Sequence, residues 1–205
     1  MDEKQVCMEF ARKIRDLMEM ALVECLEEVE YGTSDSDEDD DRFNMLRELS
    51  TLTTELLKYD NIENKILSLA NQSTVNGTDN EIKLKTFKMI RNVIAHFPIF
   101  DSYEDIIISE EILSWNDSKN GSVKKYFDEF GGKTLKCRIY YKMPSDREYK
   151  EIKTISFKIE KIDNGNTIKL CDMLSLNDAI WMFSIVDYYL DYLGLSIFPQ
   201  FGLSM

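Results

Sequence analysis

Residues 80–97 read NEIKLKTFKMIRNVIAHF, and this stretch decides the fold class that the chain predicts. At about 100° per residue on a helix, four apolar side chains share one narrow arc. They are Phe87, Ile90, Ile94 and Phe97. Such an arc is the core-facing stripe of an amphipathic helix. Pro98 predicts its end, because proline disfavours helical geometry in the preceding residue. We therefore expect a helix at 80–97 that packs into a bundle.

The side of this helix away from the stripe predicts a site for an anion. It carries Lys85, Lys88, Arg91, Asn92, Ala95 and His96. His96 is the only histidine of the chain, and imidazole both takes and gives a proton near neutral pH. Arg91 and His96 flank the small Ala95, which leaves room for a phosphate between them. Exposed carbonyls at a helix end favour an imidazolium, which would raise the His96 pKa if nothing else intervened.

The whole chain is acidic, with 25 Lys and Arg against 38 Asp and Glu, a net charge of -13. This charge argues against a protein that coats nucleic acid through bulk electrostatics. Any contact with nucleic acid must therefore be local. The same helix offers a basic island, since Glu81 is the one acid near four cations. These cations are Lys83, Lys85, Lys88 and Arg91.

Several classes of protein are disfavoured by the remaining composition. The acidic start of the chain and the lack of 18 consecutive apolar residues argue against secretion and membrane insertion. The four cysteines form no Cys-x-x-Cys pair, and one histidine gives no zinc ligand set, so reduced thiols in a cytoplasmic protein are expected. Residues 34–41 resemble a calcium loop but lack its glycine and final glutamate. A solvated loop between helices is the expectation there.

Apolar spacing predicts further helices along the chain. They lie at 5–31, 42–58, 60–71, 123–130 and 175–194. The last opens with a capping box at Ser175 and stops at Gly194. Its aromatic residues, from Trp181 to Tyr192, are spaced for a core or a dimer interface, with base stacking as the alternative. Residues 106–115 fit either a strand or a short helix.

From residue 134 the apolar period changes from helical spacing to two, which is typical of strands. Strands are expected at 135–143, 149–160 and 167–171, with turns at Pro144-Ser145-Asp146 and Asn164-Gly165. They predict a three-stranded antiparallel meander. The predicted protein is thus mainly α, with a helical bundle at 1–131, a β insertion at 132–172 and a C-terminal helix at 173–205 that packs back on the bundle.

The run from Arg91 to His96 resembles the signature of the HEPN superfamily, Arg-x-x-x-x-His at the end of a bundle helix. Asn92 stands where that signature has a polar residue after the arginine. The helical order of residues 5–97, with a helix returning at 175–194, resembles the family more loosely. The strands are not part of the core family pattern. The resemblance implies an HEPN-like helical bundle into which a small β-meander is inserted.

This resemblance implies a metal-independent endoribonuclease that acts as a homodimer without a cofactor. The catalytic residues would be Arg91, Asn92 and His96, in a cleft shared by two copies. RNA cleavage by the 2'-hydroxyl needs a base and an acid, and two chains supply two imidazoles. Arg91 would stabilise the developing charge, Asn92 would orient the reacting groups, and Lys85 and Lys88 would guide RNA. Many family members are toxins or stress and anti-phage defence effectors, some restrained by an antitoxin or another inhibitor protein.

Three other interpretations stay open. His96 could merely satisfy a carbonyl at the helix end, with Arg91 in a surface ion pair. A non-catalytic HEPN-like module would use the same pair to bind a nucleotide or partner protein, as a dimerising or regulatory scaffold. The acidic stretch 34–41 could instead mimic nucleic acid or capture a basic enzyme. Expression distinguishes the nuclease from the non-catalytic module, because an active nuclease should slow bacterial growth and His96→Ala or Arg91→Ala should relieve that effect.

Overall fold

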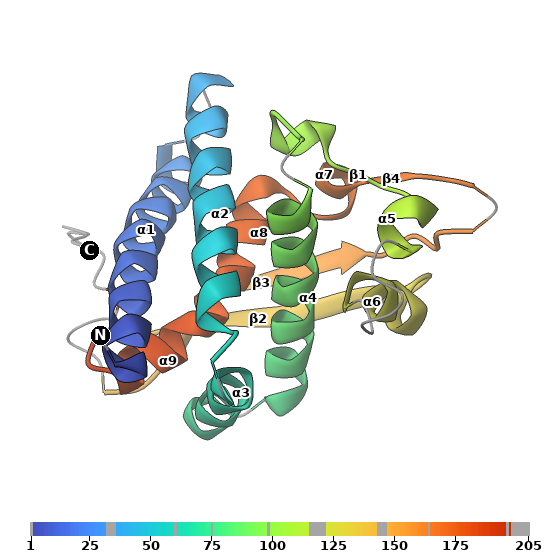
Figure 1. Ribbon diagram of the computed structural model, residues 1–205. Coiled ribbons are helices and arrows are strands. Elements are labelled where there is room, and N and C mark those ends of the chain that lie inside the picture. The colour runs from blue at the N-terminus through green and yellow to red at the C-terminus, as the bar shows by residue number, and fades with distance from the viewer. Residues whose placement is uncertain are drawn as a thin grey trace.

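The computed structural model describes residues 2–31, 36–59, 61–74, 76–97, 99–114, 122–142, 147–163, 165–195 and 197. It begins with two long helices, α1 (Glu3–Tyr31) and α2 (Ser36–Leu56), which pack side by side (Figure 1). The helix expected from residue 42 therefore begins earlier, and the loop expected at 34–41 is helical from Ser36 onward. Residues 32–35 lie outside the described part. No helix within that part combines the length and the apolar character needed to cross a membrane.

Helix α4 (Gly77–His96) is the centre of the fold and matches the helix expected at 80–97. It packs against α2, α3 (Ile62–Ser73), α6 (Ser122–Phe130), α8 (Leu176–Phe183) and strand β2 (Thr134–Tyr141). Phe87, Ile90 and Ile94 are buried, as their spacing predicts, and the Phe87 ring meets that of Phe183 edge to face. Because so many elements surround α4, burial extends well beyond its apolar stripe.

The strands form two antiparallel pairs instead of one meander. Strand β2 pairs with β3 (Lys150–Lys158) as expected. The third expected strand is only Ile168–Lys169, β4, and it pairs with β1 (Ile107–Ile108). Between β3 and β4, Asn166 closes a local turn by binding the Asp163 N–H and the Lys161 carbonyl, each at 2.8 Å. The chain thus turns away from β3, and Ile168 becomes buried opposite Ile108.

The segment before α6 contains both alternatives that its sequence allowed. After the 3-10 turn η1 (Tyr103–Asp105) come strand β1 and then the short helix α5 (Glu110–Ser114). The Tyr103 hydroxyl donates to the Leu174 carbonyl at 2.9 Å, which ties this segment to the C-terminal part of the chain. The short helix α7 (Leu170–Met173) follows β4 directly, so the strand expected at 167–171 is limited to Ile168 and Lys169, and the last two of its expected residues are helical.

The C-terminal helix begins as predicted but is interrupted. Ser175 caps α8, because its side chain accepts the Asp178 N–H at 3.1 Å. After Phe183 the chain forms the 3-10 turn η3 (Ser184–Val186) and then α9 (Asp187–Tyr192). Ser184 donates to the Trp181 carbonyl at 2.6 Å, a bond that competes with regular helix geometry. Trp181, Phe183 and Tyr188 are buried and Tyr192 is 58% exposed.

The buried apolar side chains of the helices, the hairpin and the C-terminal segment form one cluster. Helix α8 packs against α1, α2 and α4, and β2 covers another side of α4. The structure is thus mainly helical with small antiparallel β elements, as the sequence predicts. The HEPN-like identity of the bundle and the division at 131 and 172 stay predictions.

Candidate functional site

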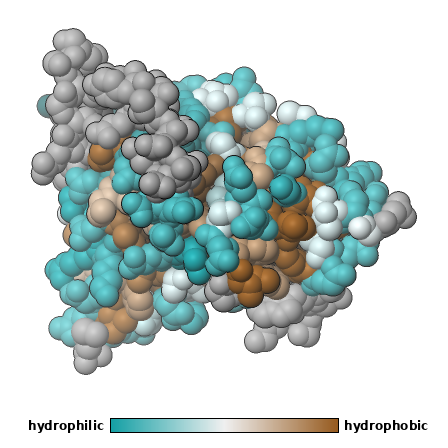
Figure 2. All heavy atoms as spheres, turned by 90° about the horizontal axis from the view of Figure 1, so that it is seen from above, coloured by the Kyte–Doolittle hydropathy of each residue, from teal (hydrophilic) through white to brown (hydrophobic). Residues whose placement is uncertain are grey.

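The last turns of α4 carry the residues that the sequence selected. The helix ends at His96, where the Phe97 N–H donates to the Val93 carbonyl at 3.1 Å. Viewed from above, toward the end at which α4 finishes, hydrophobic residues reach the surface in a group among hydrophilic ones (Figure 2). Ile99, three residues after His96, is 76% exposed. The end of α4 is therefore accessible, and apolar surface lies beside it.

Arg91 lies deeper than its helical position predicts. The residue is only 9% exposed, so it is not on an unused outer face. Its guanidinium carbon lies 6.0 Å from the centre of the Phe87 ring, and its Nε has no hydrogen-bond partner among the described residues. Burial lowers the Arg91 pKa from its usual value, and the nearby Glu63 opposes that shift. The structure thus holds a cation with unused donor capacity at low exposure.

His96 is exposed, one turn beyond Arg91. Its pKa is lowered from the usual value by partial burial first, and then by the positive charges of Arg91 and Lys58. The rise in pKa expected from the helix end alone does not appear, because burial first, and then the charges of Arg91 and Lys58, act against it. A lowered pKa keeps the imidazole neutral at pH 7, which is the form that accepts a proton.

The basic island expected along α4 is largely neutralised. Lys85 forms an ion pair with Glu129 of α6 at 2.7 Å, and Lys88 pairs with Glu63 of α3 at the same distance. Both pairs are partly exposed, so each is weak and open to exchange with another anion. Asn92 is half-buried on the same helix, next to Arg91. Two of the neighbours found here, Lys58 and Glu63, come from the α2–α3 region and carry no sequence signal, because only packing brings them to α4.

Lys83 does not belong to this surface at all. It is fully buried, with its ammonium 3.5 Å from the Ser184 hydroxyl and 5.6 Å from the centre of the Tyr188 ring. Burial lowers its pKa to about 8, although Cys137, Asp187 and Asp79 act in the opposite direction. The sequence placed Lys83 on the basic island, and that prediction is wrong because α8, η3 and β2 cover this side of the helix.

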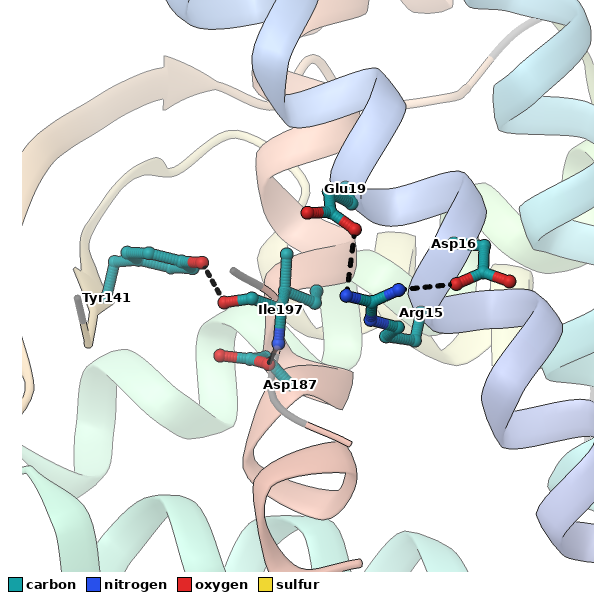
Figure 3. Close-up of polar contacts among 6 residues, drawn as sticks. All are labelled: Arg15, Asp16, Glu19, Tyr141, Asp187 and Ile197. Atoms are coloured by element: carbon teal, nitrogen blue, oxygen red, sulfur yellow. Dashed lines mark hydrogen bonds and ion pairs between the residues drawn. The ribbon is translucent and has the colours of Figure 1, made fainter. Parts of the chain in front are cut away.

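A second polar cluster lies next to Lys83, in the first half of α4, and includes Asp187 and Tyr141. Burial raises the pKa of Asp187 to about 7, against the effects of the Ile197 N–H and of Lys83 and Lys142. Asp187 accepts the Ile197 N–H at 3.3 Å, and the Tyr141 hydroxyl donates to the Ile197 carbonyl (Figure 3). Both backbone groups of Ile197 are thus held from two different elements. The cluster thus holds Ile197 against β2 of the hairpin and against α9.

Arg15 of α1 lies beside these contacts of Ile197 (Figure 3). It pairs with Asp16 at 2.7 Å and with Glu19 at 3.0 Å (Figure 3). Its charge also acts on the buried Tyr141, whose pKa is raised by burial. The cluster has an evident structural role and is closed to solvent, so it is a poor candidate for substrate chemistry.

The end of α4 is thus the better candidate site. It combines an exposed neutral imidazole, a guanidinium close enough to act on it, and lysines in exchangeable ion pairs. Over the described ranges there is no group of three or more His, Cys, Asp or Glu side chains arranged to hold a metal ion. No family model, curated protein or solved structure matches the chain in comparisons with known proteins. The chemistry of these residues must carry the functional argument alone.

Proposed function

We propose that this protein is a metal-independent endoribonuclease of HEPN type, a toxin or defence effector of the cytoplasm that acts as a homodimer. The observation that carries the proposal is the placement of the single imidazole. His96 is exposed at the end of α4, and the charge of Arg91 helps to lower its pKa. A neutral imidazole can take the proton of a ribose 2'-hydroxyl near pH 7.

The arrangement supports a role for each residue of the motif. His96 of one copy would act as base and His96 of the second as acid, since the chain has one histidine. Arg91 would donate to the phosphorane, because its Nε lacks a partner among the described residues. Asn92 would orient the phosphate, and Lys85 and Lys88 would exchange their carboxylate partners for RNA phosphates. A second copy would have to dock at this end of α4, so that the two imidazoles lie in one cleft.

The burial of Arg91 favours a second candidate function. A guanidinium that is 9% exposed can hold an anion tightly without moving toward a reacting group. In that case the protein would be a non-catalytic dimerising or regulatory module, which binds a nucleotide or a partner protein at the same place. The two candidate functions use the same site and differ in whether the protein cleaves the bound RNA.

The decisive experiment follows cleavage of a fluorophore-quencher RNA by the purified protein in EDTA. The wild type should release fluorescence and leave 2',3'-cyclic phosphate ends, and an RNA with 2'-deoxyribose at every position should stay intact. His96→Ala and Arg91→Ala should each abolish cleavage, while Arg12→Ala, an exposed arginine of α1, should cleave like the wild type. Sedimentation of the wild type should show a dimer.

Two results would contradict the proposal. Activity that needs a divalent cation, or that survives His96→Ala, would place the chemistry elsewhere. A wild type that binds a nucleotide but never cleaves would favour the regulatory module. In that case Arg91→Ala should lose nucleotide binding, since the same guanidinium would hold the ligand.

A further inference from the structure

The β2–β3 hairpin carries a polar outer face that no step of the proposed reaction uses. Residues 135, 137, 139 and 141 of β2 are buried, and the alternate residues point the other way. On that outer face the exposed residues of the regular part of the hairpin are Thr134, Lys136 and Arg138 of β2 and Thr154, Ser156 and Lys158 of β3. An exposed acid, Glu151, ends the row, where it accepts the Thr154 hydroxyl at 2.7 Å. Packing of β2 on α4 leaves this set on the opposite side of the sheet.

The strand register orders these six residues into three cross-strand pairs. Thr134 stands opposite Lys158, Lys136 opposite Ser156, and Arg138 opposite Thr154. Every pair therefore joins one cation to one hydroxyl. Directly opposed cations would repel each other across the strands, and this arrangement avoids that repulsion. Cations and hydroxyls are also the two kinds of side chain that commonly bind phosphate oxygens.

The local charge contrasts with that of the whole chain. Residues 132–172 hold ten Lys and Arg against six Asp and Glu, a net charge of +4 within a chain of -13. Lys136 forms no ion pair with any residue that the structure describes. Arg138 lies 3.7 Å from Glu151, and Lys158 lies 2.7 Å from Glu160, with all four side chains at least 44% exposed. Exposed pairs of this kind contribute little, so a phosphate can replace the carboxylate.

We propose that the outer face of the β2–β3 hairpin binds the phosphate backbone of single-stranded RNA. This inference rests on the proposed ribonuclease activity, because that activity selects RNA among polyanions. Tyr140 follows Arg138 on the same side of β2, is half-buried and stands opposite Glu151. Its aromatic ring lies at the end of the row, where a base could stack on it. A local basic face would also give RNA a fixed approach to a protein whose remaining surface repels it.

The test measures binding apart from cleavage. A fluorescein-labelled single-stranded RNA of about 15 nucleotides, within the span that one binding surface covers, is titrated with the full chain carrying His96→Ala. Fluorescence anisotropy is recorded at several salt concentrations between about 50 and 200 mM. The test variant adds Lys136→Gln, Arg138→Gln and Lys158→Gln. The matched control adds Lys4→Gln, Arg12→Gln and Lys13→Gln, which removes the same charge from exposed positions of α1.

The hairpin variant should lose affinity on the order of tenfold at low salt, and its plot of log K against log salt should be shallower by about 2, or about 0.7 for each lost phosphate contact. The control should keep the affinity and the slope of the parent. Equal losses in both variants would overturn the inference, because net charge alone would then explain them. Unchanged thermal unfolding of both variants excludes a folding defect.

Two further outcomes separate this inference from the proposed function. If the hairpin binds RNA as expected and the wild type does not cleave, the binding face stands and the nuclease proposal fails. If polyglutamate of equal charge displaces the RNA as well as unlabelled RNA does, the inference is overturned. The face would then suit an acidic protein segment, such as residues 35–41 of a second copy, which are six acids and one serine.

Discussion

The two halves of α4 carry basic residues with opposite surroundings. In the first half Lys83 is fully buried among Asp187, Ser184 and Tyr188. At the last turn His96 is exposed, and Arg91 below it keeps a small accessible fraction. The same helix therefore holds one polar cluster that supports the fold and another that is open to ligands. The difference comes from what covers the helix, since η3 and β2 pack on α4 beside Lys83 while its last residue stays exposed.

The largest effect is expected from removal of the carboxylate in the closed cluster. Asp187→Ala removes the acceptor of the buried Ile197 N–H and a carboxylate whose charge acts on the buried Lys83, so the free energy of unfolding should fall by about 1 to 3 kcal/mol. Urea unfolding followed by circular dichroism measures this free energy.

Asp191→Ala is the matched control, because Asp191 pairs with Lys142 at 3.3 Å where both side chains are about 30% exposed. That change should cost less than about 1 kcal/mol. Equal effects would show that the cluster does not depend on the Lys83 charge.

A second experiment separates the clusters by pH. Burial lowers the Lys83 pKa from 10.5 to about 8. Between these two pH values Lys83 is therefore mostly neutral in the folded state and mostly protonated in the unfolded chain. The stability linked to this group is complete above pH 10.5 and is lost as pH falls through 8. In Lys83→Met the dependence disappears. Between pH 8 and 10.5 the wild type should therefore gain up to about 3 kcal/mol of unfolding free energy relative to this variant.

The control for this experiment is Lys125→Met, an exposed position on α6. Its difference from the wild type should stay constant over the same pH range, because titration of tyrosines and other groups is common to both proteins. A Lys83→Met difference that also stays constant would mean that Lys83 is charged at equal cost in both states, and the account of a closed cluster would be wrong.

The contrast also explains what the sequence could predict. Periodicity located most of the long helices to within about three residues, because each helix needs its own apolar stripe. It missed the early start of α2 at Ser36 and the interruption after α8. It also predicted the β2–β3 hairpin and the Ser175 cap, which depend on local residues. It did not predict that Ile168 pairs with Ile108, since that pairing joins segments about 60 residues apart. Local patterns define elements, and only packing decides which elements become neighbours.

The candidate site shows the same limit. The spacing of Arg91 and His96 identified the end of α4, and the structure keeps His96 exposed there. Helix geometry placed Arg91 on an outer face, and the count of cations placed Lys83 on the basic island, because neither shows how many elements will cover a helix. Lys58 and Glu63 were missed for the same reason. The basic face of the hairpin was readable from the alternation of charges at 134–158, but the sequence had drawn attention to the lysines of α4 instead.

The smallest expected effect concerns the proton affinity of the open cluster. Because the chain has one histidine, its imidazole carbon-bound protons give an unambiguous pair of NMR signals. Their titration midpoint should lie below the ordinary histidine value of about 6.5. Lys58→Gln removes one of the cations that disfavour the imidazolium, so the midpoint should rise. Lys13→Gln on α1 should leave it in place.

This titration decides which field acts on the proposed base. A midpoint above 6.5 that ignores Lys58→Gln would mean that the carbonyls at the end of α4 dominate, and the imidazole would then carry a proton over more of the neutral range. A depressed midpoint that responds to Lys58 would instead make cleavage rise as pH increases through that midpoint, because the base form accepts the 2'-hydroxyl proton. The Lys58→Gln variant should shift the rising limb of the pH–rate profile to higher pH, by the same amount as the midpoint of the NMR titration. A matching shift in the NMR titration and in the pH–rate profile would show that the His96 imidazole acts as the base in cleavage.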